Sequence, residues 1–106
     1  MKRRDIVLAR VFFSDSPESK VRPAVVLSDD GYHAGGFVLV AAITTAADDY
    51  CLAINENDAD CALERGSRAR FDGIIKLHGK QVVKRIGKIT PQFHVKLVER
   101  MIAMVK

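Results

Sequence analysis

Runs of β-branched and aromatic residues recur along the first half of the chain, separated by polar segments rich in turn-forming residues. Residues 5–13 (DIVLARVFF) form the first run and predict a strand that is buried on much of both faces. Two further runs, residues 23–28 (PAVVLS) and 37–44 (FVLVAAIT), predict a second and a third strand. The polar residues 14–20 and 29–36 between the three runs predict loops.

The pattern is less regular in the second half of the chain. Residues 67–72 alternate as in a strand, with Ala69 and Phe71 on one face and polar side chains on the other. A short strand is expected at residues 51–54, followed by an exposed turn or loop at residues 55–60. A second turn is expected at residues 78–80, and a last strand at residues 81–89.

The C-terminal segment changes to a helical period. Its apolar residues predict one buried stripe of an amphipathic helix, formed by Leu97, Val98, Met101, Ile102 and Val105. Thr90 is placed to cap the helix N-terminus, and Pro91 to occupy its first position. Several short strands followed by one helix predict a mostly β fold, a small antiparallel barrel with a C-terminal helix, in a single domain over residues 1–106.

The formal net charge of +4 is distributed unevenly along the chain. Residues 1–27 have a balance of +3, residues 28–64 contain eight acids and no Lys or Arg, and residues 65–106 have a balance of +9. Clustered bases suit a phosphate backbone, because they displace condensed counterions. Three solvated surfaces of mixed sign would give the same count, and charge alone leaves both interpretations open.

The sequence also argues against several classes of protein. No apolar run approaches the roughly 20 residues that span a bilayer, and the basic N-terminus lacks the apolar core of a signal peptide. Cys51 and Cys61 lack zinc-ligand spacing, and we expect small buried or semi-buried side chains rather than a disulfide. We therefore expect a soluble, cytoplasmic protein with no membrane partner.

Five segments, in their order and spacing, resemble the MazF/PemK/Kid family of toxin–antitoxin toxins. In residues 20–28 (KVRPAVVLS), an Arg-Pro precedes an apolar strand and a Ser, as in that family. Residues 5–8 resemble the family's opening strand, and residues 41–44 its third strand. Residues 67–72 resemble a later strand, and residues 86–90 the segment before the terminal helix. Arg4 stands where a glycine is usual.

The resemblance implies an SH3-like barrel of the MazF/CcdB type, a homodimer, and a metal-independent, sequence-specific endoribonuclease that cleaves single-stranded RNA. It also implies a cognate antitoxin, whose disordered tail folds onto the toxin dimer. No cofactor or metal is implied, and His33, His78 and His94 show no ligand spacing.

RNA carries its own nucleophile for this reaction. Its 2′-OH attacks the adjacent phosphorus, which leaves a 2′,3′-cyclic phosphate and a 5′-hydroxyl. The enzyme then needs a base for the 2′ proton, positive charge on the non-bridging oxygens and an acid for the leaving oxygen.

The resemblance places the family's catalytic arginine on Arg22 and its functional hydroxyl on Thr44. A guanidinium offers a bidentate fork to two phosphate oxygens and stays charged. Without the resemblance, Arg22 is interpreted as a surface ion-pair residue and Thr44 as one that satisfies backbone groups. Thr45 replaces Thr44 if the register differs by one residue.

Arg70 and Asp72 form an Arg-x-Asp pair that a strand would point to one face, and the Kid branch of the family uses such a pair. A structural ion pair is the alternative. Glu18 is similar to a loop glutamate of the MazF branch, although it lies one residue closer to the arginine. Three further residues are expected to contact the substrate: Ser19, Lys20 and Ser28.

Two other functions fit the same architecture. The related CcdB toxins poison DNA gyrase and cut no RNA, and a barrel that has lost its chemistry would only bind RNA. The pair Arg22 and Thr44 favours the ribonuclease. We expect the acids of residues 48–60 to lie away from the RNA path.

Overall fold

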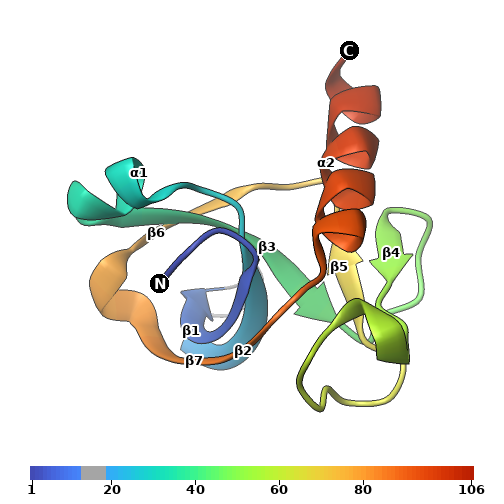
Figure 1. Cartoon of the computed structure of the whole chain (residues 1–106), viewed down its shortest axis with the longest axis horizontal. Coiled ribbons are helices and arrows are strands. Elements are labelled where there is room, and N and C mark those ends of the chain that lie inside the picture. The colour runs from blue at the N-terminus through green and yellow to red at the C-terminus, as the bar shows by residue number, and fades with distance from the viewer. Residues whose placement is uncertain (13–18) are drawn as a thin grey trace.

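The computed structural model describes residues 1–12 and 19–106, and its dominant feature is a curled antiparallel sheet (Figure 1). Helix α2 (Pro91–Val105) packs beside this sheet, and a short helix, α1 (Asp30–Ala34), precedes its third strand. Seven strands of the described residues form the sheet: β1 (Asp5–Phe12), β2 (Ser19–Val26), β3 (Phe37–Thr44), β4 (Cys51–Ala53), β5 (Arg68–Arg70), β6 (Ile75–His78) and β7 (Val82–Lys88).

Hydrogen bonding orders the strands β4-β5-β3-β2-β1-β7, and β6 pairs with the first half of β3. The two ends of this order meet at one isolated bridge between Ala59, which follows β4, and Ile89, which follows β7. The sheet therefore curls like a barrel, but among the described residues its strand pairing is not continuous around the whole circumference. The predicted mostly β fold with a C-terminal helix is confirmed.

Strands β1, β2 and β3 are buried on both faces, in two separate cores. One core lies between these strands and α2, and β1 contributes Ile6 to it. The other core lies on the opposite face, and β1 contributes Val7, Ala9 and Val11 to it. The sequence prediction of a first strand buried on much of both faces is therefore confirmed for the described part of that strand.

Helix α2 begins where the sequence predicts. The Thr90 side chain accepts a hydrogen bond from the Phe93 amide at 3.1 Å, and Pro91 is the first helical residue. A proline is tolerated there because the first amides of a helix have no partner within it. In the described part of the chain, no helix combines the length and apolar character that crossing a bilayer requires.

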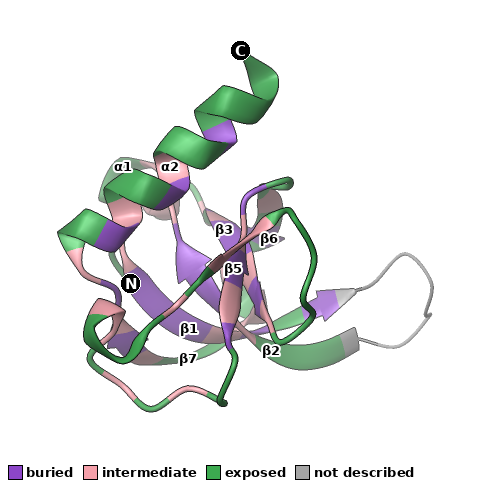
Figure 2. Cartoon of the chain, turned by 90° about the vertical axis from the view of Figure 1, so that its right-hand side faces the viewer, coloured by how far each residue is buried: buried purple, intermediate pink, exposed green. Residues whose placement is uncertain are grey.

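The buried stripe of α2 differs from the predicted one at both ends. Phe93, Leu97 and Met101 are buried, so the stripe starts one turn earlier than predicted. Ile102 and Val105, which the sequence assigns to the stripe, are exposed. The reason is that the last turns of the helix project beyond the sheet that covers its first turns (Figure 2).

Strand β2 begins at Ser19, four residues before the predicted start at Pro23. Lys20 and Arg22 therefore lie within a strand and not in a loop or at a junction. Pairing with β1 imposes this conformation, because the antiparallel register runs from Ile6 opposite Val25 to Phe12 opposite Ser19. A polar segment gives no apolar signal for such an extension.

Three other elements differ from the sequence predictions. Helix α1 lies where a loop is predicted, and its Asp29 cap accepts from the Tyr32 amide at 3.0 Å. Strand β6 is not predicted, because four residues are too few for a clear alternation. The two predicted turns contain 3₁₀ turns, at Glu56–Asp58 and Gly79–Gln81. The strands predicted at residues 51–54, 67–72 and 81–89 are present and shorter.

Arg4 has a positive φ of 76°, a conformation in which glycine is unstrained and arginine is not. Its amide donates to the Val26 carbonyl at 2.8 Å, and its carbonyl accepts from the Ile89 amide at 2.9 Å. Its guanidinium adds a bond to the Ile89 carbonyl at 3.1 Å. These bonds hold the strained residue in place. The positive φ is the reason why glycine suits this position.

We expect Gly87→Ala to destabilise the fold by about 1–3 kcal/mol, as overpacking does. Gly87 is buried in β7, and a Cβ there would collide with the side chain of the half-buried, free Cys61 and approach an Asp60 oxygen to 2.8 Å. Urea unfolding monitored by circular dichroism measures the change. Gly73→Ala is the matched control, because a Cβ at Gly73 meets nothing within 4 Å. Equal unfolding midpoints for both variants would contradict this close packing.

Candidate active site

A cavity of about 660 Å³ opens at the end of β3, between β2 and β5. Apolar side chains such as Val11, Val40 and Ile75 form part of its lining. Three of the predicted catalytic residues line this cavity: Arg22, Thr44 and Arg70. Three further polar residues also line it: Thr45, Glu64 and Ser67.

Arg22 and Thr44 each lie two residues beyond the last pair of the β2–β3 ladder, Ala24 opposite Ala42, and both line the cavity. On its other side, Thr44 pairs with Arg68 of β5. Arg22 is exposed, and its guanidinium forms no ion pair within the described residues.

The hydroxyl of Thr44 is positioned by the backbone that follows it. Its oxygen accepts a hydrogen bond from the Ala46 amide at 3.1 Å. A hydroxyl that accepts one bond keeps its own proton, so Thr44 can still donate to an anion in the cavity. Thr45 is exposed and lines the same cavity, so both residues stay candidates.

Two carboxylates hold the guanidinium of Arg70. Asp72 accepts from Nε and Nη2, both at 3.0 Å, and Asp48 accepts from Nη1 at 2.9 Å. The expected Arg-x-Asp pair is therefore present as a bidentate ion pair that engages both Asp72 oxygens. Asp72 does not line the cavity, but borders an apolar groove beside α2.

Asp48 is the acid of residues 48–60 that contacts a cavity residue, because it bonds to Arg70, and the expectation that these acids lie away from the RNA path stays a prediction. The Asp48 carboxylate also accepts from the Tyr50 amide at 2.9 Å, and this bond, followed by the bond from Arg70, lowers the pKa of Asp48 below its ordinary value. The cause is strand pairing, because β4 places Cys51 opposite Arg70 and so brings the preceding residues to the site.

Other acids of that segment do lie elsewhere. Asp58 accepts from the Asn55 amide at 2.8 Å, and Asp60 accepts from the Lys88 amide at 2.7 Å. Neither residue lines the cavity that contains Arg22. Their positions are consistent with the expectation, which stays a prediction.

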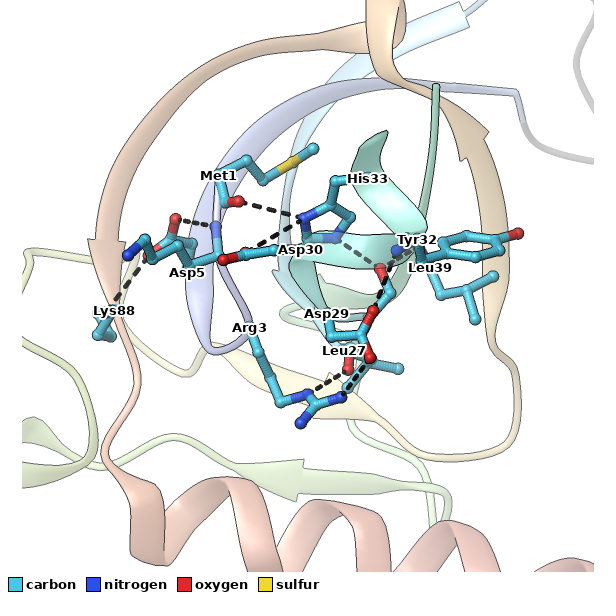
Figure 3. A network of polar contacts seen from close by, with 12 residues as sticks. Met1, Arg3, Asp5, Leu27, Asp29, Asp30, Tyr32, His33, Leu39 and Lys88 are labelled. Carbon is cyan, nitrogen blue, oxygen red and sulfur yellow. Dashed lines mark hydrogen bonds and ion pairs between the residues drawn. The ribbon is translucent and has the colours of Figure 1, made fainter. Parts of the chain in front are cut away.

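Ser28, an expected substrate contact, is buried outside the cavity. Its hydroxyl accepts from the Leu39 amide at 2.9 Å and lies 2.7 Å from His33 Nε2. The other ring nitrogen of His33 lies 3.1 Å from the Met1 carbonyl and 4.0 Å from Asp30 (Figure 3). These contacts fasten α1 and the N-terminus to the sheet, and they give Ser28 a structural position.

The remaining expected residues lie on β2 or before it. Lys20 is exposed and does not line the cavity, but it lies two residues before Arg22 and therefore on the same face of the strand. Ser19 is the first residue of β2. Glu18 lies outside the described residues.

The sequence analysis missed Glu64, which lines the cavity from the segment before β5. Its carbonyl accepts two bonds from Ser67, from the amide at 3.1 Å and from the hydroxyl at 2.5 Å. Gly66, at φ 83°, allows the tight turn between them. The glycine of this Glu-Arg-Gly-Ser segment signals a turn, but no sequence pattern shows that the turn faces Arg22.

No group of three or more His, Cys, Asp or Glu residues in the described parts of the chain is arranged to hold a metal ion. The polar chemistry that the cavity offers is therefore that of two guanidinium groups, two threonine hydroxyls, a serine and one carboxylate. Such a set can bind an oxyanion and exchange a proton with a bound hydroxyl.

Comparison with known proteins matches residues 2–105 to the profile of the PemK-like, MazF-like toxin of type II toxin–antitoxin systems. A comparison with curated protein sequences gave no match. Among solved structures, an endoribonuclease in complex with its cognate antitoxin from Mycobacterial species is similar, with 14% identity over 99% of this chain and 94% of that chain, and a TM-score of 0.78.

Two further solved structures share the fold. The Mycobacterium tuberculosis toxin MazF-mt6 is 21% identical over 92% of each chain, with a TM-score of 0.73. MazE-MazF from Deinococcus radiodurans is 13% identical over 99% of this chain and 95% of that chain, with a TM-score of 0.79. At these identities the similarity shows the fold.

We expect Arg70→Ala to raise the pKa of Asp48 only part of the way to its ordinary value. The bond from the Tyr50 amide is the largest single cause that lowers that pKa, and the variant retains it. Carboxyl-detected NMR titration measures the change. Arg65→Ala removes a nearby arginine that does not contact Asp48, so it serves as the control. An Asp48 pKa that is unchanged by Arg70→Ala would contradict the contact.

Proposed function

Because the chain belongs to the PemK-like, MazF-like toxins of type II toxin–antitoxin systems, we propose that it is a metal-independent, sequence-specific endoribonuclease, the toxin of such a pair. The observation that carries the proposal is the cavity that Arg22 and Thr44 both line. The similar Mycobacterial structure is described as an endoribonuclease, which supports the proposal.

In the proposed reaction, the RNA supplies its own nucleophile and the protein supplies the charge. Arg22 binds the non-bridging oxygens of the scissile phosphate, and Thr44 donates a second hydrogen bond. Removing one such donor costs roughly 10²–10³-fold in rate in well-studied enzymes. The products are a 2′,3′-cyclic phosphate and a 5′-hydroxyl.

Arg70 and Asp72 have a different part in this proposal. With three of its N–H groups bonded to carboxylates, Arg70 is a rigid wall of the cavity rather than a mobile phosphate clamp. Its remaining N–H groups can support the bound phosphate from a fixed position. Asp72 and Asp48 are then positioning residues, which act through Arg70.

The substrate we propose is single-stranded RNA in the cytoplasm. Lys20 extends the positive charge of Arg22 along one face of β2, so the RNA backbone would follow that strand. Glu18 and Ser19 precede Lys20 in sequence, and they stay proposed contacts. Ser28 is left out, because its hydroxyl is buried in the α1 contacts.

The proposed protein partners are a cognate antitoxin and a second copy of this chain. MazE-MazF from Deinococcus radiodurans and the Mycobacterial complex pair a similar chain with an antitoxin. An apolar groove of about 410 Å³ lies between the second half of α2 and residues 71–74. Ile74 and Ile102 are more than half exposed there, and Val105 is 86% exposed. We propose that the second copy covers this groove.

We expect Arg22→Ala to abolish discrete cleavage of a long single-stranded RNA in EDTA, because it removes a cation that lines the cavity. The wild type should give fragments with 5′-hydroxyl ends, read by end-labelling. Arg3→Ala is the control, since Arg3 is exposed near the far end of the β1–β2 pair, where it bonds to the Leu27 carbonyl. Failure of the wild type to cut a broad RNA set would overturn the function. Cleavage that survives Arg22→Ala would overturn only the role of Arg22.

We expect Ile102→Lys to convert a dimer into a monomer, because it places a charge in the apolar groove. Light scattering after gel filtration measures the mass in solution. Val83→Lys is matched to it, since Val83 is half exposed on β7, away from the groove. A wild type that is monomeric over the tested concentrations would refute the dimer. A dimer that withstands Ile102→Lys while Val83→Lys disrupts it would move the interface to β7.

A further inference from the structure

We propose that Glu64 is the general base that accepts the proton of the attacking 2′-OH. This inference rests on the proposed ribonuclease function and assigns the step that Arg22 and Thr44 leave open. It depends on three features of the cavity: where Glu64 enters it, which carboxylates are already bonded, and what lies opposite.

Glu64 enters the cavity from a turn that the structure holds firmly. Both the amide and the hydroxyl of the buried Ser67 bond to the Glu64 carbonyl, and β5 begins directly after Ser67. The backbone of Glu64 is therefore fixed next to the strand that pairs with Thr44. A base must be held in place to be efficient, since proton transfer needs hydrogen-bond distance to the hydroxyl.

The other carboxylates near the site are engaged in the described part of the chain, which does not include Glu18. Both oxygens of Asp72 accept from Arg70, and each oxygen of Asp48 accepts at least one hydrogen bond. Bonds to a carboxylate stabilise its charged form and weaken it as a base, as the lowered pKa of Asp48 indicates. Within the described residues, the Glu64 carboxylate forms no ion pair, and Glu64 is the only Asp or Glu residue that lines the cavity.

The strand order places Glu64 and Arg22 on opposite sides of Thr44. β3 lies between β5 and β2, so the turn before β5 and the exposed end of β2 flank the end of β3. Strands two apart in a sheet are separated by roughly 10 Å. That span accommodates a phosphate at Arg22 and Thr44, with the adjacent ribose toward Glu64. The arrangement separates the cation from the base, so that neither neutralises the other.

The proposed step balances without a co-reactant other than water. The 2′ proton passes to the Glu64 carboxylate as the 2′-oxygen bonds to phosphorus. The bond from phosphorus to the 5′-oxygen breaks, and that oxygen takes a proton from water. Glu64 then returns its proton to water, and the enzyme regains its starting state.

Glu64→Gln tests the proposal, because glutamine keeps the shape of the side chain and cannot accept the proton. With the full chain and a mapped RNA substrate in EDTA, we expect kcat to fall about 10²–10⁴-fold while the Kd for RNA changes less than about threefold. Glu64→Asp should restore part of kcat. Glu56→Gln, an exposed glutamate in the 3₁₀ turn after β4, is the matched control and should cleave as the wild type does.

Two further measurements separate a base from a merely structural residue. The acidic limb of the kcat/KM profile should be present in the wild type and absent in Glu64→Gln. An RNA with a sulfur in place of the 5′-bridging oxygen has a leaving group that needs no acid. The defect of Glu64→Gln should persist on that substrate, whereas recovery of the rate would make Glu64 the acid and overturn the proposal.

The outcomes distinguish this inference from the function on which it rests. If the wild type cuts no RNA, the proposed function fails and this inference fails with it. If the wild type cuts RNA and Glu64→Gln cuts it at the same rate with the same acidic limb, the function stands and the base lies elsewhere. Equal losses in affinity and in rate would make Glu64 a binding residue and would also overturn the assignment.

Discussion

The burial of β1, β2 and β3 on both faces is the constraint on which the rest of the structure depends. Ile6 faces the core under α2, and its neighbour Val7 faces the other core. Because the residues of these strands that face the two cores are committed to packing, polar chemistry is left to their exposed positions. Arg22 is exposed in the first half of β2 and Thr44 lies at the end of β3, and both line the cavity.

The two arginines of the cavity differ in how freely they can bind an anion. Arg70 is fixed by Asp72 and Asp48, so its charge is largely balanced before any ligand arrives. Arg22 has no such partner in the described residues. In such a site Arg70 forms a fixed wall and Arg22 contacts the anion. Little reorganisation of the protein is needed when the anion binds.

Sequence reasoning succeeded where one physical signal dominates. The apolar run of β1 and the Thr90-Pro91 start of α2 are such signals, and both are confirmed. Arg22, Thr44 and Arg70 reach one cavity as expected, although their roles stay predictions. Lys20 was placed in a loop because its strand conformation comes from pairing with Val11, which a linear pattern does not record.

The failures concern relationships between distant segments. Ser28 follows an apolar strand and has a residue type suited to substrate binding, but α1 and His33 occupy its hydroxyl. Asp48 belongs to an acidic stretch, yet the pairing of β4 with β5 brings it to Arg70. Glu64 precedes a strand by a turn, and only the strand order reveals what that turn faces. Each of these positions is set by tertiary structure rather than by local preference.

The pairing of β1 with β7 has a consequence for a chain that is still being synthesised. Asp5 pairs with Lys88, and the core under α2 needs Phe93 and Leu97. Contacts this far apart in sequence form late in folding. Every residue named for the reaction is translated before β7 and α2, the elements that complete the fold. A nascent chain therefore carries all of these side chains before the last strand and the helix that pack against the start of the chain exist.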